Sequence, residues 1–553
     1  MACASGPGYA QQASQPAFDP AQLERRFEAQ QQGVRREPRL PSARSAGGDV
    51  KDQSPSILVR RVVIEGATTI PADELAFAYK DLLGRKISNQ ELAGIVSAIS
   101  EKYRSAGFHL SRAVIPPQDV ADGILRVKVI EGGFKELVLK GEGAEKFDLR
   151  GMLAPVLAEQ ASRLSTLERQ LLLANARPGV RIEDTAIEEI ETATGQFRLI
   201  LEVRTWHVFT SVGVDNLGSS SVGPWQSYGT AAFNSYLTPG DSLVFNASTT
   251  PGDPRQLRFG RIAYDLPVGI DGTRIGASGY YSEVWPGDYR RLFSDNVKTG
   301  SFEVHGSIVP LQTQSATVTL TAATTFTDAS EHDVFGLLYA DRIRTASLTA
   351  DTRVQDSLRG TNYFTLNFRQ GLDILGASPR DDDYISRWDT SPKFSATTFW
   401  FTRYQTLTDA WSVKLAAAGQ TSSGPVYTSQ QFYLGGVAFG RGYGSAEISG
   451  DNGLAGSAEL RFDQKTSYQY LSGYQLYAFV DSGVAWNSGY QMSEGLSLTS
   501  FGAGIRLFMT DGLQADIGVA APLGYRAPDN STRDARVLFS LSSALKLCPV
   551  RAT

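Results

Sequence analysis

The stretch LQADIGVAA at residues 513–521 alternates between larger apolar side chains and small or polar ones. Residues 454–463, LAGSAELRFD, alternate in the same way, and their polar phase carries Glu459, Arg461 and Asp463. A period of two places the two phases on opposite faces of a β-strand. An apolar face opposite a charged one is typical of a strand between lipid and a water-filled lumen. Because every backbone polar group in lipid needs a partner, such strands must close into a barrel.

The composition limits this barrel to the second part of the chain. Of the 111 charged side chains (53 basic, 58 acidic), the first 204 of 553 residues hold 54, but they hold only 10 of the 56 aromatic residues. The remaining 349 residues hold all seven Trp, 19 of 22 Tyr and only five Lys. Low charge with many aromatic residues is typical of outer-membrane strands and their aromatic girdles. We therefore predict an antiparallel transmembrane β-barrel over 205–548, with sixteen strands at about 21 residues per strand and loop.

The sequence also excludes several other classes of protein. No run of 18 apolar residues exists, which excludes a transmembrane helix. Cys3 and Cys548 lie at opposite ends, which excludes a disulfide framework and a cysteine metal site. A net charge of −5 gives no electrostatic case for nucleic acid. The chain has no G-x-S-x-G elbow, phosphate-binding glycine loop or H-E-x-x-H motif, and its four His are scattered. We predict no enzymatic activity, no cofactor and no metal.

The N-terminal 55 residues divide into three short segments. Residues 1–17 are small and polar, and we interpret them as an export-signal remnant or a disordered tail. Residues 18–31 predict a helix whose apolar stripe is only Leu23 and Phe27, too thin for burial in a core. Residues 32–55 are rich in Gly, Pro, Ser and Arg, as in a flexible linker. At the other end, 549–553 is interpreted as a tail.

Two small α/β modules occupy the region between the linker and the barrel. Residues 56–132 and 133–204 each predict the order β-α-α-β-β, which makes an internal repeat. In the first module, 71–84 is predicted as the first helix. Capping boxes at Ser88/Glu91 and Ser165/Glu168 predict the start of the second helix of each module. Edge strands of these sheets can accept an extended peptide by strand addition, or they can simply pack on neighbours.

Residues 107–118, GFHLSRAVIPPQ, followed by Gly123 and by VIEG at 129–132, resemble the first POTRA domain of the two-partner-secretion outer-membrane transporters, the TpsB family of ShlB/FhaC/HecB type. The signature positions of this resemblance are Phe108, Ser111, Pro117, Gln118, Gly123, Glu131 and Gly132. Two further motifs of that family have counterparts in the barrel region. One is Gly440-Arg441-Gly442-Tyr443 within 431–453, and the other is Phe479-Val480-Asp481-Ser482-Gly483.

The resemblance implies that Arg441 lies at the tip of a loop folded into the lumen. It also implies that Phe479, Asp481 and Gly483 lie on an inward-facing strand, with Asp481 pairing with Arg441 to lock the loop. Alternation independently places these three residues in one phase. The alternative is that Arg441 and Asp481 belong to unrelated lumenal networks. The family pattern has Val before this Arg, whereas this chain has Gly440, so we expect a tip of different rigidity.

The resemblance also implies a function and a place in the cell. The POTRA domains would lie in the periplasm and capture an unfolded exoprotein, β-helical and haemolysin- or adhesin-like, through its N-terminal secretion domain. That chain would thread through a barrel embedded in bacterial outer-membrane lipid and inserted by the barrel-assembly machinery. The helix at 18–31 would plug the resting lumen, and folding outside the cell would drive export. The alternatives are a barrel-assembly-type insertase, a diffusion porin and a soluble binding protein.

Overall fold

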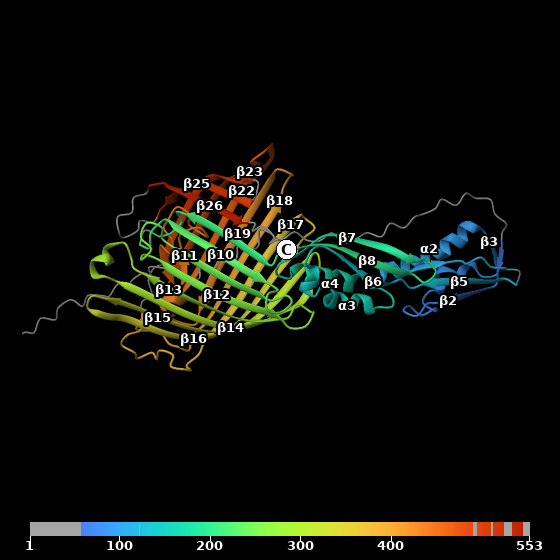
Figure 1. Ribbon diagram of the computed structural model, residues 1–553, viewed down its shortest axis with the longest axis horizontal. Coiled ribbons are helices and arrows are strands. Elements are labelled where there is room, and N and C mark those ends of the chain that lie inside the picture. Colours follow the sequence, from blue (N-terminus) through green and yellow to red (C-terminus); the bar gives the residue numbers. More distant parts are fainter. Residues whose placement is uncertain are drawn as a thin grey trace, which may run out of the picture.

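The computed structural model describes residues 57–120, 122–219, 221–489, 495–509, 512–524 and 534–545. The segments predicted at 1–17, 32–55 and 549–553, and the helix at 18–31 with Leu23 and Phe27, lie outside these ranges. Within the ranges, no helix is both long and apolar enough to cross a bilayer. Two α/β units follow one another away from one end of a barrel, so the molecule is elongated (Figure 1).

The first α/β unit places one long helix beside a small sheet. Its strand β5 pairs in parallel with β2 and antiparallel with β4, while β1 and β3 form a separate pair. Helix α2 buries Ile95, Ile99 and Tyr103 in the core of the unit. The elements are β1 (Ile57–Val59), β2 (Arg61–Glu65), η1 (Ala76–Ala78), η2 (Lys80–Leu82), β3 (Arg85–Ile87), α2 (Asn89–Ser105), β4 (Arg112–Val114) and β5 (Ile124–Ile130).

The predicted helix at 71–84 is wrong. The segment forms two separate 3-10 turns, η1 and η2, because Tyr79 between them leaves the helical region at φ −139°. Gly84 then turns the chain with φ +79° into β3. The capping box of α2 is confirmed, since the Ser88 hydroxyl accepts from the Glu91 amide (3.2 Å) and the Glu91 carboxylate accepts from the Ser88 amide (2.7 Å).

The second α/β unit packs two helices on a three-stranded sheet of order β6-β8-β7. Its elements are β6 (Gly133–Lys140), η3 (Ala144–Phe147), α3 (Leu149–Ala158), α4 (Leu164–Ala176), β7 (Val180–Glu191) and β8 (Gln196–Thr205). The capping box predicted at Ser165/Glu168 is wrong, because the N-cap of α4 is Arg163, two residues before Ser165, and the helix begins at Leu164. The Arg163 amide donates to the Glu159 carboxylate (2.8 Å), so Glu159 satisfies the helix start and leaves Glu168 free for another contact.

A closed barrel of sixteen antiparallel strands follows, which confirms the predicted strand number and pairing. Strand β26 pairs with β9 and closes the barrel. The wall strands are β9 (Val208–Asp215), β10 (Gln226–Asn234), β11 (Ser242–Thr249), β12 (Arg258–Pro267), β13 (Arg274–Val284), β14 (Asn296–Gln312), β15 (Ala316–Asp333), β16 (Gly336–Gln355), β17 (Gly360–Gly371), β18 (Ser395–Thr406), β19 (Trp411–Ser422), β22 (Asn452–Tyr468), β23 (Leu471–Trp486), β24 (Leu496–Met509), β25 (Leu513–Leu523) and β26 (Arg536–Leu545).

Alternation along these strands separates the lipid side from the lumen. Val480 on β23 is half exposed, whereas its neighbour Asp481 is fully buried inside. Leu460 on β22 is likewise exposed next to the buried Glu459. Outward apolar and inward polar faces are what a bilayer and a wet lumen require, and the pattern predicted from the sequence is confirmed.

The second unit is held on the barrel by α4. The Arg169 guanidinium donates to the carbonyls of Asp271 (3.2 Å) and Val309 (2.9 Å), at the barrel end nearest the unit. The Glu168 carboxylate accepts from the Gln314 amide in the turn between β14 and β15 (2.6 Å). Val309 also packs against the core of the second unit. Polar and apolar contacts together fix the unit over one side of the barrel mouth.

Candidate functional site in the barrel lumen

The segment between β19 and β22 carries a short hairpin that packs against the inside of the wall. Its strands β20 (Phe432–Leu434) and β21 (Ile448–Gly450) pair with each other and not with the wall ladder. The apolar side chains of the segment contact small residues of the wall strands. Phe439 packs against Trp400 with ring centroids 5.0 Å apart and ring planes inclined by 47°. The buried members of this cluster are Leu434, Phe439, Tyr443, Ile448, Ala416, Ala418, Ala455, Ala485 and Leu498.

Glycines turn the chain at the tip of this loop. Gly435, Gly436 and Gly440 all have positive φ, and Gly440 stands at +87°. A valine, as in the family pattern, would be strained in that conformation, so this tip is turned by glycine. At Gly442, a Cβ would lie 2.8 Å from backbone atoms of Ala521 and Pro522, so the tip fits closely against the wall.

Arg441 projects from the tip and meets Asp481 on β23. Its Nε and Nη2 donate to the two carboxylate oxygens at 2.9 and 2.8 Å, and its own amide donates to the same group at 3.1 Å. Its guanidinium carbon lies 3.3 Å from the centre of the Phe479 ring. A forked guanidinium suits this two-point contact, and a buried site screens it little. The structure thus brings both predicted motifs together.

A second carboxylate, Glu459 on β22, extends this contact into a network. It accepts from Arg441 Nη1 (2.5 Å), Arg461 Nε (2.8 Å) and Arg506 Nη1 (2.8 Å). Arg506 also donates to Asp516 (2.9 Å). The sequence places Glu459, Arg461 and Asp516 in lumen-facing phases. Their meeting with Arg441 depends on strand register, which the sequence alone does not reveal.

The other residues of the two motifs position the loop. The Tyr443 hydroxyl donates to the carbonyls of Thr499 (3.1 Å) and Leu523 (3.2 Å), and the Tyr443 carbonyl accepts from Arg536. At Gly483 a Cβ would lie 2.9 Å from the Leu434 side chain, so β23 has no room for a larger residue where the hairpin packs against it. These contacts join the loop to several strands of the wall.

A buried ion pair that the sequence did not indicate anchors the base of the loop. Arg387, in the segment between β17 and β18, pairs with Asp451, and both side chains are almost completely buried. Asp451 also accepts from the amides of Val426 (3.0 Å) and Ser488 (2.8 Å). One carboxylate therefore ties three connecting segments together at the end of the barrel away from the α/β units.

The signature residues of the first α/β unit stabilise its fold through hydrogen bonds and close packing. Glu131 accepts from the amides of Thr68 (2.8 Å) and Thr69 (2.7 Å) and from the Tyr103 hydroxyl (2.9 Å). Burial raises the pKa of Glu131, but these hydrogen bonds outweigh it and hold that pKa below its ordinary value. At Gly132 a Cβ would lie 2.4 Å from the Leu110 carbonyl.

The remaining signature residues also have structural contacts. Ser111 accepts from the Gly132 amide (3.2 Å), and Gln118 exchanges two hydrogen bonds with the Arg126 backbone (2.7 and 2.8 Å). Gly123 has φ +73° and Phe108 is buried. Pro117, by contrast, is exposed and makes no hydrogen bond among the described residues. None of them lies near the lumenal network.

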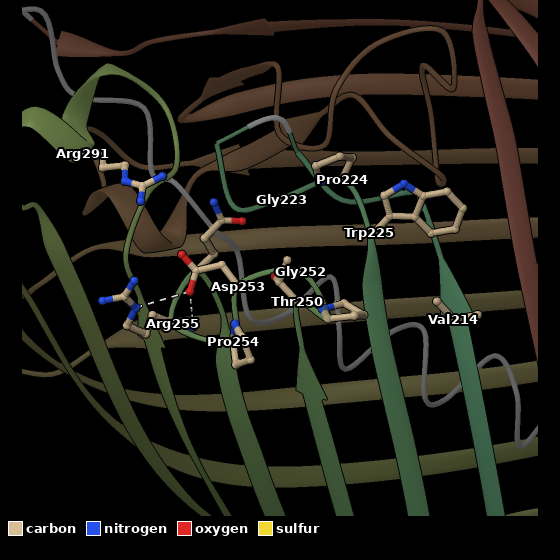
Figure 2. A pocket seen from close by; sticks show the side chains of 12 residues that line it. Val214, Gly223, Pro224, Trp225, Thr250, Gly252, Asp253, Pro254, Arg255 and Arg291 are labelled. Atoms are coloured by element: carbon tan, nitrogen blue, oxygen red, sulfur yellow. Dashed lines mark hydrogen bonds and ion pairs between the residues drawn. The ribbon is translucent and has the colours of Figure 1, made fainter.

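A cleft of about 820 Å³ lies among the connecting segments at the loop end of β9–β12. Trp225, Thr250 and Arg291 contribute to its lining (Figure 2). Its Asp253 and Arg255 pair with each other at 3.3 Å. Across the ranges that the structure describes, no group of three His, Cys, Asp or Glu side chains could hold a metal ion.

The fold and the lumenal site define the class of protein: an outer-membrane barrel that carries α/β units and a loop folded inside. The family model "Haemolysin secretion/activation protein ShlB/FhaC/HecB" matches residues 200–507, and the model "POTRA domain, ShlB-type" matches 57–132. The chain belongs to this haemolysin secretion/activation family of two-partner-secretion transporters. Its barrel lies in the outer membrane and its POTRA region in the periplasm, as the sequence predicted.

Named relatives share most of the chain. The heme/hemopexin transporter protein HuxB of Haemophilus influenzae strain KW20 is 24% identical over 479 residues, which cover 82% of this chain and 81% of HuxB. The outer membrane transporter CdiB of Escherichia coli is 25% identical over 535 residues (86% of this chain, 83% of CdiB). A solved structure of CdiB from Escherichia coli has the same fold, with TM-score 0.73 at 20% identity over 95% of this chain and 97% of CdiB. The family assignment decides against the insertase, porin and soluble alternatives.

Proposed function

We propose that this protein exports one unfolded partner exoprotein, and that the lock between Arg441 and Asp481 controls the position of the lumenal loop during export. The observation that carries the proposal is the two-point contact of Arg441 with the fully buried Asp481, inside a closed barrel. A chain crossing the lumen needs the volume that the loop tip occupies. The contacts of Arg441 therefore set how readily that volume is vacated.

Capture of the exoprotein is proposed to occur by strand addition to an α/β unit. The sheet order β6-β8-β7 leaves β7 hydrogen-bonded to β8 on one side only. An extended peptide can add a strand to such an edge. The proposed exoprotein is β-helical and haemolysin- or adhesin-like, with an N-terminal secretion domain. The names of HuxB and CdiB as transporters support export as the shared activity.

The other parts of the chain have proposed roles in the same process. We propose an export-signal remnant or tail at 1–17, a plug helix at 18–31 held by Leu23 and Phe27, and a linker at 32–55. POTRA domains at 56–132 and 133–204 precede the barrel at 205–548 and a tail at 549–553. We further propose that export involves no enzymatic step, cofactor, metal or nucleic acid, and that the barrel-assembly machinery inserts the barrel into lipid.

The test is reconstitution of export in a host that lacks both proteins. The candidate exoprotein is the product of a neighbouring gene that encodes a large β-helical protein. We expect it in the medium only when this transporter is co-expressed, and we expect export to fail when residues 57–204 are deleted. Heat-modifiable gel mobility shows that the truncated barrel still folds. Release of the exoprotein without the transporter, or undiminished release without 57–204, would contradict the proposal.

A further inference from the structure

Five neighbouring wall strands, β12–β16, carry charged side chains near their outer ends. The α/β units mark the periplasmic end of the barrel, so the opposite strand ends face the cell exterior (Figure 1). Strand register places Arg258 opposite Glu283, Glu283 opposite Lys298, and Lys298 opposite Ser330. Two residues nearer the membrane centre on β15, Asp328 lies opposite Arg342. Adjacent strands are about 4.8 Å apart, so these side chains form one band across the wall.

The charged band faces outward. Arg258 shares its phase on β12 with Ile262, Glu283 shares its phase on β13 with Tyr281, and Lys298 shares its phase on β14 with Phe302. These apolar partners are all about half exposed, as expected for lipid-facing residues. On β16, Arg342 shares its phase with Leu348, which is 56% exposed.

The rest of the described wall lacks such charges. In the outward phase of β9–β11, β17, β19 and β22–β26, the described side chains are uncharged. On β18 the outward phase has Arg403, but this residue lies at the periplasmic end and pairs with Asp356 (2.5 Å). Charge on a lipid-facing surface is tolerated near the interface and costly at mid-membrane. The band on β12–β16 therefore lies at the level of the lipid headgroups.

Within the band, cations exceed anions. Glu283 is shared between Arg258 (3.3 Å) and Lys298 (4.0 Å). Arg344 is nearly buried and pairs with Asp328 (2.7 Å). The band thus holds four cations and two anions: Arg258, Lys298, Arg342 and Arg344 against Glu283 and Asp328. Arg342 is exposed and has no ion-pair partner among the described residues, so Lys298 and Arg342 can donate to anionic oxygens.

An apolar floor lies directly below this band. Tyr281, Phe302 and Phe326 lie two to four residues nearer the membrane centre on the same face, about 7–13 Å along the strands. The rings of Phe302 and Phe326 have centroids 6.5 Å apart, and the Arg344 guanidinium lies 5.8 Å from the Phe326 ring. Cations above an aromatic floor match a lipid with phosphates above acyl chains.

We propose that the outer ends of β12–β16 bind a phosphorylated glycolipid of the outer leaflet. Lys298 and Arg342 donate to its phosphate oxygens, and Tyr281, Phe302 and Phe326 contact its acyl chains. Charge-assisted hydrogen bonds from Lys and Arg to phosphate are strong, and an interface excludes competing water on one side. This site lies on the outside of the barrel, so the inference does not rest on the proposed export function.

The test measures binding of lipopolysaccharide to the full-length protein in neutral detergent by native mass spectrometry. Lys298→Gln/Arg342→Gln is expected to weaken binding by roughly tenfold, as the loss of charge-assisted hydrogen bonds implies. The matched control is Lys393→Gln/Arg380→Gln, which removes the same charges from an exposed connecting segment and is expected to bind as the unmodified protein does. Heat-modifiable gel mobility verifies that both variants hold folded barrels.

Three further arms distinguish the source of the phosphate. The unmodified protein is expected to bind dephosphorylated lipopolysaccharide only weakly, and phosphatidylcholine likewise. In each case the affinity is expected not to exceed that of Lys298→Gln/Arg342→Gln for intact lipopolysaccharide. Inorganic phosphate in molar excess is expected to leave the lipid bound. Equal binding by the unmodified protein and Lys298→Gln/Arg342→Gln, equal loss in both variants, or displacement by inorganic phosphate would overturn the proposal.

Discussion

Arg441 concentrates several kinds of contact in one side chain. It forks onto Asp481, donates to Glu459 and lies over the Phe479 ring. Arginine is suited to this geometry because its planar guanidinium donates in two directions and stacks on aromatic faces. A lysine supplies the same charge from a single point. The proposed lock therefore depends on the shape of the side chain as well as on its charge.

Arg441→Ala is expected to lower secretion while leaving barrel insertion intact. The change leaves Asp481 buried without its cation, a loss of about 3–5 kcal/mol in a buried pair, which the loop tip relieves by moving. Arg441→Lys is expected to restore only part of the activity. The measurement is exoprotein in the medium, with Arg380→Ala as the control. Normal secretion by Arg441→Ala would contradict the proposed gating role.

Gly442→Ala is expected to dislodge the loop tip. Its added Cβ would lie 2.8 Å from backbone atoms of β25, which cannot move without breaking the wall ladder. Gly424→Ala is the matched control, because its Cβ meets nothing within 4 Å. Labelling of a cysteine placed at Ser445 in intact cells reports the loop position. Equal labelling in the two glycine variants would show that the close fit does not hold the tip.

Glu131→Gln is expected to destabilise the first α/β unit by about 1–3 kcal/mol at pH 7. The folded-state pKa of Glu131 lies below its ordinary value, so its charge stabilises the fold above that value. This stabilisation is lost as the pH falls through the depressed folded-state pKa. Pulse proteolysis of the full-length protein in urea measures the free energy of unfolding. The difference in this free energy between Glu131→Gln and the parent protein is expected to narrow toward pH 3. A difference that stays constant with pH would rule out the charged carboxylate as the cause.

At the scale of elements, period-two alternation predicted the barrel strands because lipid and lumen impose opposite chemistry on adjacent residues. Helical spacing was less reliable at 71–84, where Leu75, Tyr79 and Leu82 suggested one helix but the chain makes two separate turns. The motifs around Arg441 and Asp481 indicated a contact across 40 residues. The partners Glu459 and Arg506 could not be predicted, because their meeting depends on the register of β22, β23 and β24.

Deletion of residues 18–31 is expected to raise single-channel conductance in planar bilayers. A helix with so thin an apolar stripe suits a polar lumen, and its removal would widen the path for ions. Deletion of 36–49, an equal length of the predicted linker, serves as the control. Unchanged conductance after loss of 18–31 would refute the plug assignment.

At the scale of the whole molecule, the two α/β units and the barrel are joined in series. The Ser162 amide donates to the Gly132 carbonyl (2.8 Å), and Arg112 pairs with Glu189 (2.5 Å), so the two units are held to each other. Contacts of α4 with the barrel turns then hold the second unit to the mouth. An exoprotein captured by these units, as proposed, would therefore be presented to the lumen from a fixed direction.

Glu168→Ala/Arg169→Ala is expected to loosen this arrangement and to lower secretion severalfold. Both side chains bridge α4 to barrel turns, and their loss leaves mainly apolar contacts. Distances between spin labels on the second unit and the barrel should broaden. Glu145→Ala/Arg150→Ala removes an exposed pair on the same unit (3.4 Å) and is the control. Unaltered distance distributions in the first variant would show that the apolar contacts suffice.

The apolar cluster beneath the lumenal hairpin has a thermal consequence. If the loop leaves its place, as proposed, Leu434, Phe439 and Ile448 become exposed to water. Exposure of apolar surface raises the heat capacity, and the favourable free energy of burying it weakens on cooling. The equilibrium between the seated and the released loop therefore has a curved temperature dependence. Below room temperature, the ion pairs of Arg441 therefore contribute a larger share of the free energy that holds the loop in place.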